Sequence, residues 1–176
     1  MVMRNIFKRF WSDCRGIAAV EFALTAPLMC VVLLGVAELN NYMTAARKTA
    51  AAAFTAADLV AQETDITSSE LSELLQASRK VIHPLSDSNI TIGVSSVRYD
   101  DTTGNPSVDW TGNYNGGSVS NATTLATGMG AAGESVIIVT ATYSYAPLFS
   151  LIMSGTHTLE ETAITRPRYI DYVGMY

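Results

Sequence analysis

The fold is decided by the stretch RGIAAVEFALTAPLMCVVLLGVAEL, which runs from Arg15 to Leu39. After Arg15, its only charged side chains are Glu21 and Glu38. The 23 residues from Ile17 to Leu39 would form a helix of roughly 34 Å, and a bilayer's hydrocarbon core is about 30 Å thick. We therefore expect residues 17–39 to form a transmembrane helix.

Charge is distributed unevenly along the 176 residues. Residues 1–16 carry four basic side chains and one acidic one, whereas the remainder carries seven basic and fifteen acidic side chains. A basic end beside an apolar helix is typical of the cytoplasmic side of a membrane, so the acidic body is expected on the opposite side of the membrane. Dense clusters of Lys and Arg with interleaved aromatic residues are missing from the sequence, which gives nucleic-acid binding little support.

Glu21 is the unusual residue of the apolar stretch. A carboxylate costs about 2.5–3.5 kcal/mol at the centre of an inserted helix, and less near an end. Glu21 could simply lie at the membrane interface and favour a helix N-terminus. The general rule that ionisable groups inside membrane helices are functional favours a functional role instead.

The residues around Glu21 resemble a known family. Gly16 and the six residues that follow it, IAAVEF, match the pattern G-x-x-x-x-E-[FY] of type IV prepilin-like proteins. The wider run from Arg15 through Phe22 to Pro27 resembles the TadE/TadG pseudopilins of the Flp (tight adherence) pilus, with their pattern R-G-x-x-A-V-E-F-A-L-x-x-P. A weaker similarity lies near the C-terminus, in the motifs YSYAPLF and TRPRY.

This resemblance implies cleavage between Gly16 and Ile17 by a prepilin peptidase, which leaves the hydrophobic helix on the mature protein. Glu21 would then be the fifth residue of the mature chain, and its carboxylate could pair with the new α-amine of a neighbouring subunit. A bulky side chain at position 16 would block the peptidase. The implied protein is a minor pilin or pseudopilin that takes part in Flp pilus assembly and adhesion.

The same resemblance implies the location and the partners. The protein would cross the bacterial inner membrane once, with its N-terminus in the cytoplasm and its C-terminal domain in the periplasm, and could enter the pilus. Its partners would be the prepilin peptidase, other pilin or pseudopilin subunits that contact its N-terminal helix, the inner-membrane assembly machinery and the lipid bilayer.

Two other functions remain open. One is an uncleaved single-pass membrane protein with a periplasmic binding domain. The other is a membrane-tethered hydrolase that uses Asp and Ser residues of the loop region, but it lacks a recognisable motif. His83 and His157 are isolated in the sequence, so no Ser/His/Asp or Cys/His constellation is predicted and we expect no enzyme.

Neither a metal site nor a cofactor site is predicted. Asp100, Asp101, Asn105 and Asp109 offer oxygen ligands within ten residues, but their spacing does not fit a D-x-[DN]-x-[DN]-G calcium loop, so solvated turn residues are expected. Cys14 lies in the basic leader and Cys30 in the apolar stretch, so neither is expected to cross-link the later domain.

The helical pattern continues beyond residue 39. Residues 38–62 are rich in Ala and lack both Pro and Gly. Apolar residues recur there at three- and four-residue steps, which favours an amphipathic helix, and a break at Asn40–Asn41 is the alternative to one helix from about Ile17 to Gln62. The residues of the expected packed face are Leu39, Met43, Ala46, Ala50, Ala53, Phe54, Ala57, Val60 and Ala61.

The remaining sequence predicts a second helix and a small sheet. Thr67 or Ser68, with Glu70, can cap a helix that ends near His83. Strands are expected at residues 89–99, with a bulge at Ser95–Ser96, at 108–110, at 134–145 in the centre of the sheet, and at 156–165, while 111–133 is expected to be a long irregular loop.

The expected fold class is therefore α+β and pilin-like. A long N-terminal transmembrane helix and a second helix pack on a mainly antiparallel sheet of three or four strands. The expected organisation is a basic cytoplasmic leader at 1–16, a transmembrane helix at 17–39, a periplasmic extension of that helix at 40–62 and a periplasmic α+β domain at 63–176.

Overall fold

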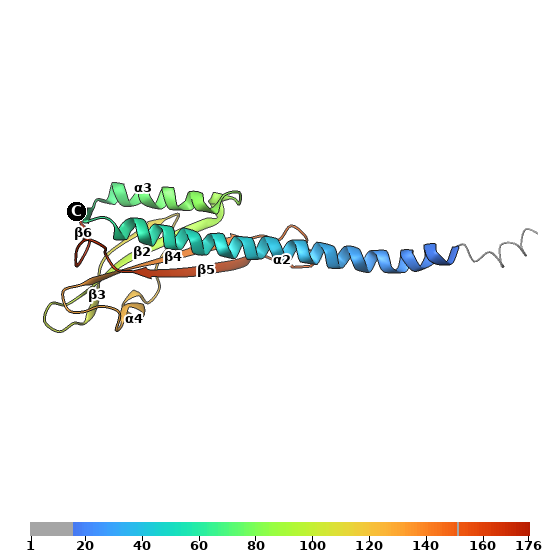
Figure 1. Cartoon of the computed structure of the whole chain (residues 1–176). Helices are drawn as coiled ribbons and strands as arrows, with labels where there is room; N and C mark the ends of the chain where they lie inside the picture. The colour runs from blue at the N-terminus through green and yellow to red at the C-terminus, as the bar shows by residue number, and fades with distance from the viewer. Residues whose placement is uncertain (1–15, 151) are drawn as a thin grey trace, which may run out of the picture.

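The computed structural model describes residues 16–150 and 152–176. Figure 1 shows one long helix, α2, whose C-terminal half carries a sheet and a second helix while its N-terminal half extends away from them. This arrangement confirms the predicted α+β class. The predicted leader before Gly16, including Arg15, lies outside the described residues.

Helix α2, Ile17–Ala61, has 45 residues without a break. It continues through Pro27 and through Asn40–Asn41, so the single helix is confirmed and the two-helix alternative is wrong. The helix ends at Ala61, and the backbone N–H of its C-cap residue, Gln62, donates to the carbonyls of Leu59 and Val60.

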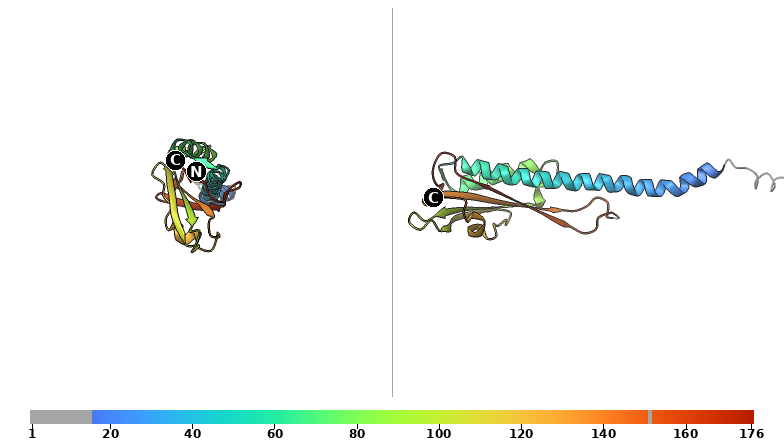
Figure 2. Two further views of the ribbon diagram at one scale, coloured as in Figure 1. Left: turned by 90° about the vertical axis from the view of Figure 1, so that its left-hand side faces the viewer. Right: turned by 60° about the horizontal axis from the view of Figure 1, so that its bottom comes forward.

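Four antiparallel strands form the main sheet, in the order β3-β2-β4-β5. They are β2, Ile90–Tyr99; β3, Pro106–Tyr114; β4, Ser135–Tyr145; and β5, His157–Thr165. Strand β4 lies in the interior of the sheet, as predicted. The view on the right of Figure 2 shows α2 running along one side of this sheet.

The packed face of α2 differs from the predicted one. Ala45, Ala52 and Ala56 are fully buried, whereas Leu39 is 56% and Phe54 is 60% exposed. Ala side chains allow a sheet to approach a helix closely, and Leu or Phe in the same place would hold it away. The predicted face was therefore wrong at Leu39, Met43 and Phe54, although Ala53, Ala57, Val60 and Ala61 are buried as expected.

The second helix begins as its sequence predicts. Helix α3, Ser68–Arg79, has Thr67 as its N-cap: the Thr67 hydroxyl accepts from the Glu70 N–H, and the Glu70 carboxylate accepts from the Thr67 N–H. Leu71 and Leu75 are buried against the core. Two short 3₁₀ turns follow, η2 at Lys80–Ile82 and η3 at Asp87–Asn89, and they lead into β2.

The predicted bulge lies on a different strand. Strand β2 pairs with β4 in uninterrupted register, and its pairing with β3 shifts between Ser96 and Val97. Because Ser96 pairs with Trp110 and Val97 with Val108, the extra residue is Asp109 on β3. The phase change in the β2 sequence reflects burial on both faces of the strand.

The outer face of the sheet is covered by a segment that was predicted to be irregular. Strand β3 continues to Tyr114, and a short helix, α4, spans Ala122–Ala126. This helix packs with Val97 and Tyr99 in a second apolar cluster, and the Tyr99 hydroxyl donates to the Ala126 carbonyl. The prediction of a wholly irregular loop over 111–133 was therefore wrong.

A two-stranded parallel sheet was not predicted. Strand β1, Asp65–Ile66, pairs with β6, Gly174–Met175. The Trp110 indole N–H donates to the Val173 carbonyl at 2.9 Å, which also holds the C-terminal segment on the domain. The chain thus returns to the distal end of α2, as the position of the C-terminus in Figure 1 shows.

Candidate functional site

Gly16 lies at the N-cap of α2 with φ −79° and ψ −14°. Any residue type can adopt this backbone conformation. A Cβ added to Gly16 would meet no other atom within 4 Å, leaving aside the adjacent residues and the helix's own backbone. The fold of the described chain therefore gives no reason for glycine at this position.

Glu21 is exposed on the second turn of α2. Its side chain makes no hydrogen bond or ion pair with any residue between 16 and 176 that the structure describes. Its backbone carbonyl accepts a hydrogen bond from the Thr25 hydroxyl at 3.0 Å. Because Ile17 lies four positions earlier, the two residues are on the same side of the helix.

The helix around Glu21 presents apolar side chains in every direction. Ile17 is 55%, Phe22 68% and Leu24 75% exposed, and Pro27 is also exposed. Within the described part of the chain, α2 is the one helix that is long and apolar enough to cross a membrane, and its most apolar 18-residue window has no buried residue. Exposed apolar surface of this extent is typical of a site that contacts a membrane or other proteins.

Glu38 is a buried carboxylate that the sequence analysis did not single out. It is 1% exposed, and it accepts hydrogen bonds from the Tyr145 hydroxyl and from two backbone amides. The amide nitrogen of Leu148 lies 3.1 Å and that of Phe149 3.0 Å from the Glu38 Oε2. The carboxylate thus connects α2 to the segment that follows β4.

Tyr145 completes this contact. Burial, and in second place the hydrogen bond to the Glu38 carboxylate, raises the pKa of the Tyr145 phenol. The ring also packs edge-to-face on Tyr42, with 5.5 Å between the ring centroids. A neutral tyrosine is therefore maintained as the hydrogen-bond donor to Glu38 through the physiological pH range.

The acidic residues of the β2–β3 turn have protein partners. The Asp100 Oδ1 accepts from the Thr103 N–H and hydroxyl and from the Thr102 N–H, which lowers the pKa of Asp100. Asp101 pairs with Arg98 at 3.3 Å. Over residues 16–150 and 152–176, no group of three or more His, Cys, Asp or Glu side chains is arranged to hold a metal ion.

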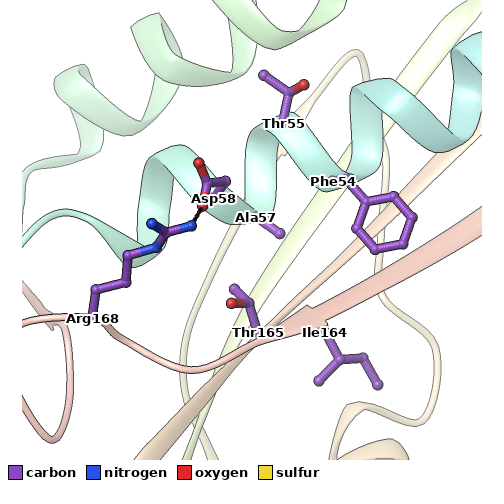
Figure 3. Close-up of a pocket in the computed structure, with 7 residues that line it drawn as sticks. All are labelled: Phe54, Thr55, Ala57, Asp58, Ile164, Thr165 and Arg168. Carbon is purple, nitrogen blue, oxygen red and sulfur yellow. Dashed lines mark hydrogen bonds and ion pairs between the residues drawn. The ribbon is translucent and has the colours of Figure 1, made fainter.

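A shallow pocket of about 420 Å³ lies between α2 and the end of β5. Figure 3 shows Phe54 at one side of it and the ion pair between Asp58 and Arg168 at the other. The Arg168 amide also donates to the Ala61 carbonyl, so this contact fixes the C-terminal segment to the helix. The residues lining the pocket are Phe54, Thr55, Ala57, Asp58, Ile164, Thr165 and Arg168.

These features define a class of protein: a helix suited to cross a membrane once, extended into an α+β domain. The family model described as TadE-like protein matches residues 16–58, and it confirms the resemblance predicted from the residues around Glu21. The match suggests involvement in the Tad pilus system and association with pilus subunits and a membrane. Comparisons with curated proteins and with solved structures give no match.

The predicted site residues lie on one short segment. Gly16, Ile17, Glu21, Phe22 and Pro27 are all exposed on the first three turns of α2 or at its start. They lie far along the helix from the sheet, as Figure 1 shows. Sequence reasoning missed the role of Glu38. The sequence did contain two signals for it, namely an acidic residue at the end of an apolar run and an uncharged link after Tyr145.

Proposed function

We propose that this chain is a minor pilin or pseudopilin of the Flp (tight adherence) type IV pilus system, processed by a prepilin peptidase between Gly16 and Ile17. Helix α2 anchors it in the inner membrane, with its α+β domain in the periplasm, and it takes part in pilus assembly. The observation that carries this proposal is the TadE-like match at residues 16–58, which begins at the proposed cleavage residue.

The surroundings of Gly16 support processing. Glycine is not required by the backbone conformation or by packing at this position. A requirement from outside the chain explains its presence, because a protease pocket that accepts only a small residue would exclude any side chain. The peptide bond after Gly16 also lies at an exposed helix start, where a membrane peptidase can reach it.

The surroundings of Glu21 support assembly. Cleavage would create an α-amine on Ile17, which is positive at neutral pH because α-amino groups titrate near 7.7–8.0. Glu21 is exposed on the same apolar helix. A carboxylate without a partner is costly in lipid, so pairing with the amine of a neighbouring subunit favours one axial stagger between helices. The pair would set the register of the assembly.

The exposed side of α2 offers the surface for such neighbours. Leu39, Met43 and Phe54 are 45–60% exposed and continue the apolar surface beyond the membrane segment. They lie at helical spacing, so they share one side of α2. Neighbouring subunits that align their helices in register would cover these side chains together with those of the membrane segment.

The alternative is an uncleaved single-pass membrane protein whose domain binds a periplasmic ligand. It shares the membrane helix, and it predicts no defect in pili when the protein is removed. The test is deletion of the coding sequence from a strain that makes Flp pili, with complementation by the wild-type chain. We expect fewer surface pili after deletion and recovery on complementation, and unchanged piliation after deletion would reject the proposed function.

A further inference from the structure

The described residues of the loop between β4 and β5, 146–150 and 152–156, reach along α2 toward the N-terminus. The view on the right of Figure 2 shows the loop as the part of the domain nearest the N-terminal half of α2. A Cβ added to Gly35 would lie 3.7 Å from Ile152 Cγ2, which is van der Waals distance. The loop therefore lies beside the apolar segment of the helix.

Hydrogen bonds hold the base of this loop in place. Glu38 accepts from the amides of Leu148 and Phe149, and Pro147 has no amide hydrogen to satisfy. The Phe149 carbonyl then accepts from the Ile152 and Met153 amides, at 3.0 and 3.3 Å, and closes a turn. The direction in which the loop projects is thus set by contacts with α2 and within the loop.

Two large apolar side chains of the loop are exposed. Leu148 is 73% exposed and Ile152 38%. The sequence has no charged residue between Tyr145 and His157. In water, exposed apolar area costs about 25 cal/mol per Å², so this loop is poorly suited to an aqueous compartment.

The neighbouring surface of α2 indicates what covers the loop. Leu33 is 70% and Val36 64% exposed on the same level of the helix, whereas Leu34 and Gly35 are half-buried. The loop thus covers one side of the helix at this level. The other sides of the helix and the exposed face of the loop are in contact with the same medium. If α2 spans the membrane, this medium is lipid, and the apolar surface of the loop is continuous with that of the helix.

Length places the loop at the edge of the bilayer. A span from Ile17 to Ala37 would measure about 31 Å, which matches the hydrocarbon thickness of about 30 Å. Glu38 is then the first residue beyond the span, and its carboxylate is satisfied by Tyr145 and two amides instead of water. Ile152 lies beside Gly35, and so it is at the level of the last helical turn of the span.

We propose that the β4–β5 loop, held by Glu38, is a second membrane-contacting element whose side chains Leu148 and Ile152 enter the lipid interface next to α2. The occupant of this surface is the acyl-chain boundary of the periplasmic leaflet. The loop fixes the depth of the domain and its rotation about the helix. This proposal needs α2 to span the membrane, but it does not need cleavage after Gly16.

The test measures contact between the loop and lipid in the full-length, unprocessed chain. With Cys14→Ser and Cys30→Ala as background, Ser150→Cys carries an environment-sensitive fluorophore, and the protein is reconstituted in phosphatidylcholine–phosphatidylglycerol vesicles. The matched control is Ser107→Cys, an exposed serine of β3 at the opposite end of the sheet. Lipids with a spin label near the head-group end of the acyl chain act as quenchers.

We expect these lipids to quench the label at position 150 and to leave the label at position 107 unaffected. The double variant Leu148→Ser/Ile152→Ser should reduce quenching at 150 toward the level at 107, because the apolar side chains that draw the loop into lipid are removed. Equal quenching at 150 and 107 would overturn the proposal. Shielding at 150 that increases with protein density, without quenching, would assign the loop to a second copy and would also overturn it.

Discussion

Gly16 and Glu21 lie on a segment that makes no contact with the sheet. Gly16 has an ordinary backbone conformation and free space around its α-carbon, and Glu21 projects from an exposed apolar helix surface. Neither residue is explained by the stability of the domain. At the residue scale, we propose that events between molecules account for both: proteolysis at Gly16 and subunit pairing at Glu21.

Replacement of Glu21 tests the pairing. Glu21→Ala should reduce surface piliation strongly and leave cleavage after Gly16 intact, because the substitution removes the partner of the Ile17 amine without changing the peptidase site. Piliation is measured by shearing and immunoblotting. Glu21→Asp is the matched control, since it keeps the charge and should restore part of the assembly. Normal piliation with Glu21→Ala would remove the electrostatic role.

Glu38 differs from Glu21, because contacts within the molecule account for its buried carboxylate. The Tyr145 hydroxyl and two loop amides surround its carboxylate. Sequence reasoning could find Glu21 through the spacing from Gly16, but it could not find Glu38. The partners of Glu38 are more than 100 residues away, and only the tertiary structure brings them together.

At the scale of elements, α2 was predictable because its sequence lacks breakers between Glu38 and Gln62 and carries the apolar stretch before them. The side of α2 that packs was not predictable in detail. Small and large apolar residues occupy neighbouring stripes of the helix, and the apolar periodicity of the sequence does not distinguish one stripe from the other. The sheet lies on the Ala stripe because small side chains permit close approach, and this preference depends on the partner surface.

Substitutions on α2 test this packing. Ala52 is fully buried, and Ala51, its neighbour, is exposed. Ala52→Leu should lower the free energy of unfolding by about 1–3 kcal/mol, because an overpacked core forces side chains and backbone to move. Ala51→Leu is the control and should change it by less than about 0.5 kcal/mol. Urea denaturation of the chain in detergent measures both, and equal effects would argue against the buried Ala face.

The capping box of α3 gives a pH dependence. The hydrogen bond from the Thr67 N–H, and in second place that from its hydroxyl, lowers the pKa of Glu70. A carboxylate with a lowered folded-state pKa contributes its full stability above the unfolded-state pKa of about 4.3, and loses it as the pH falls through the folded-state value. The wild-type chain should therefore lose more stability between neutral pH and the acidic range than Glu70→Gln does.

The measurement is the urea midpoint of both proteins at neutral and acidic pH. Thr67→Ala should cost about 1 kcal/mol at neutral pH, because it removes the side-chain oxygen that caps the Glu70 amide. An identical pH dependence in the wild type and in Glu70→Gln would show that the capping box does not account for the acid sensitivity.

At the scale of the whole molecule, the sequence predicted the α+β class, the two longest helices and the places of β2, β4 and β5, and it predicted β3 only in part. The small β1–β6 sheet could not be predicted, because a two-residue strand has no periodicity. Helix α4 could not be predicted either, because its region of the sequence is rich in Gly, Asn and Thr. The family resemblance of the segment Gly16–Pro27 was recognisable because its motif is a local spacing of residues. The contact between Glu38 and the β4–β5 loop depends on long-range packing, and so it required the structure.

At the same scale, α2 connects the proposed membrane segment rigidly to the α+β domain. The described helix supplies both the apolar surface of a membrane segment and the support of the sheet, so any axial shift of α2 in an assembly also moves the domain. Cleavage before Ile17 would create the amine that sets this shift. Processing is therefore the claim on which the assembly account depends.

The most direct test is the intact mass and N-terminal sequence of the protein purified from membranes, produced with and without the prepilin peptidase. We predict a chain that begins at Ile17 with the peptidase and retains the preceding residues without it, and Gly16→Leu should abolish the processed form. A chain that keeps the residues before Ile17 under both conditions would contradict the account.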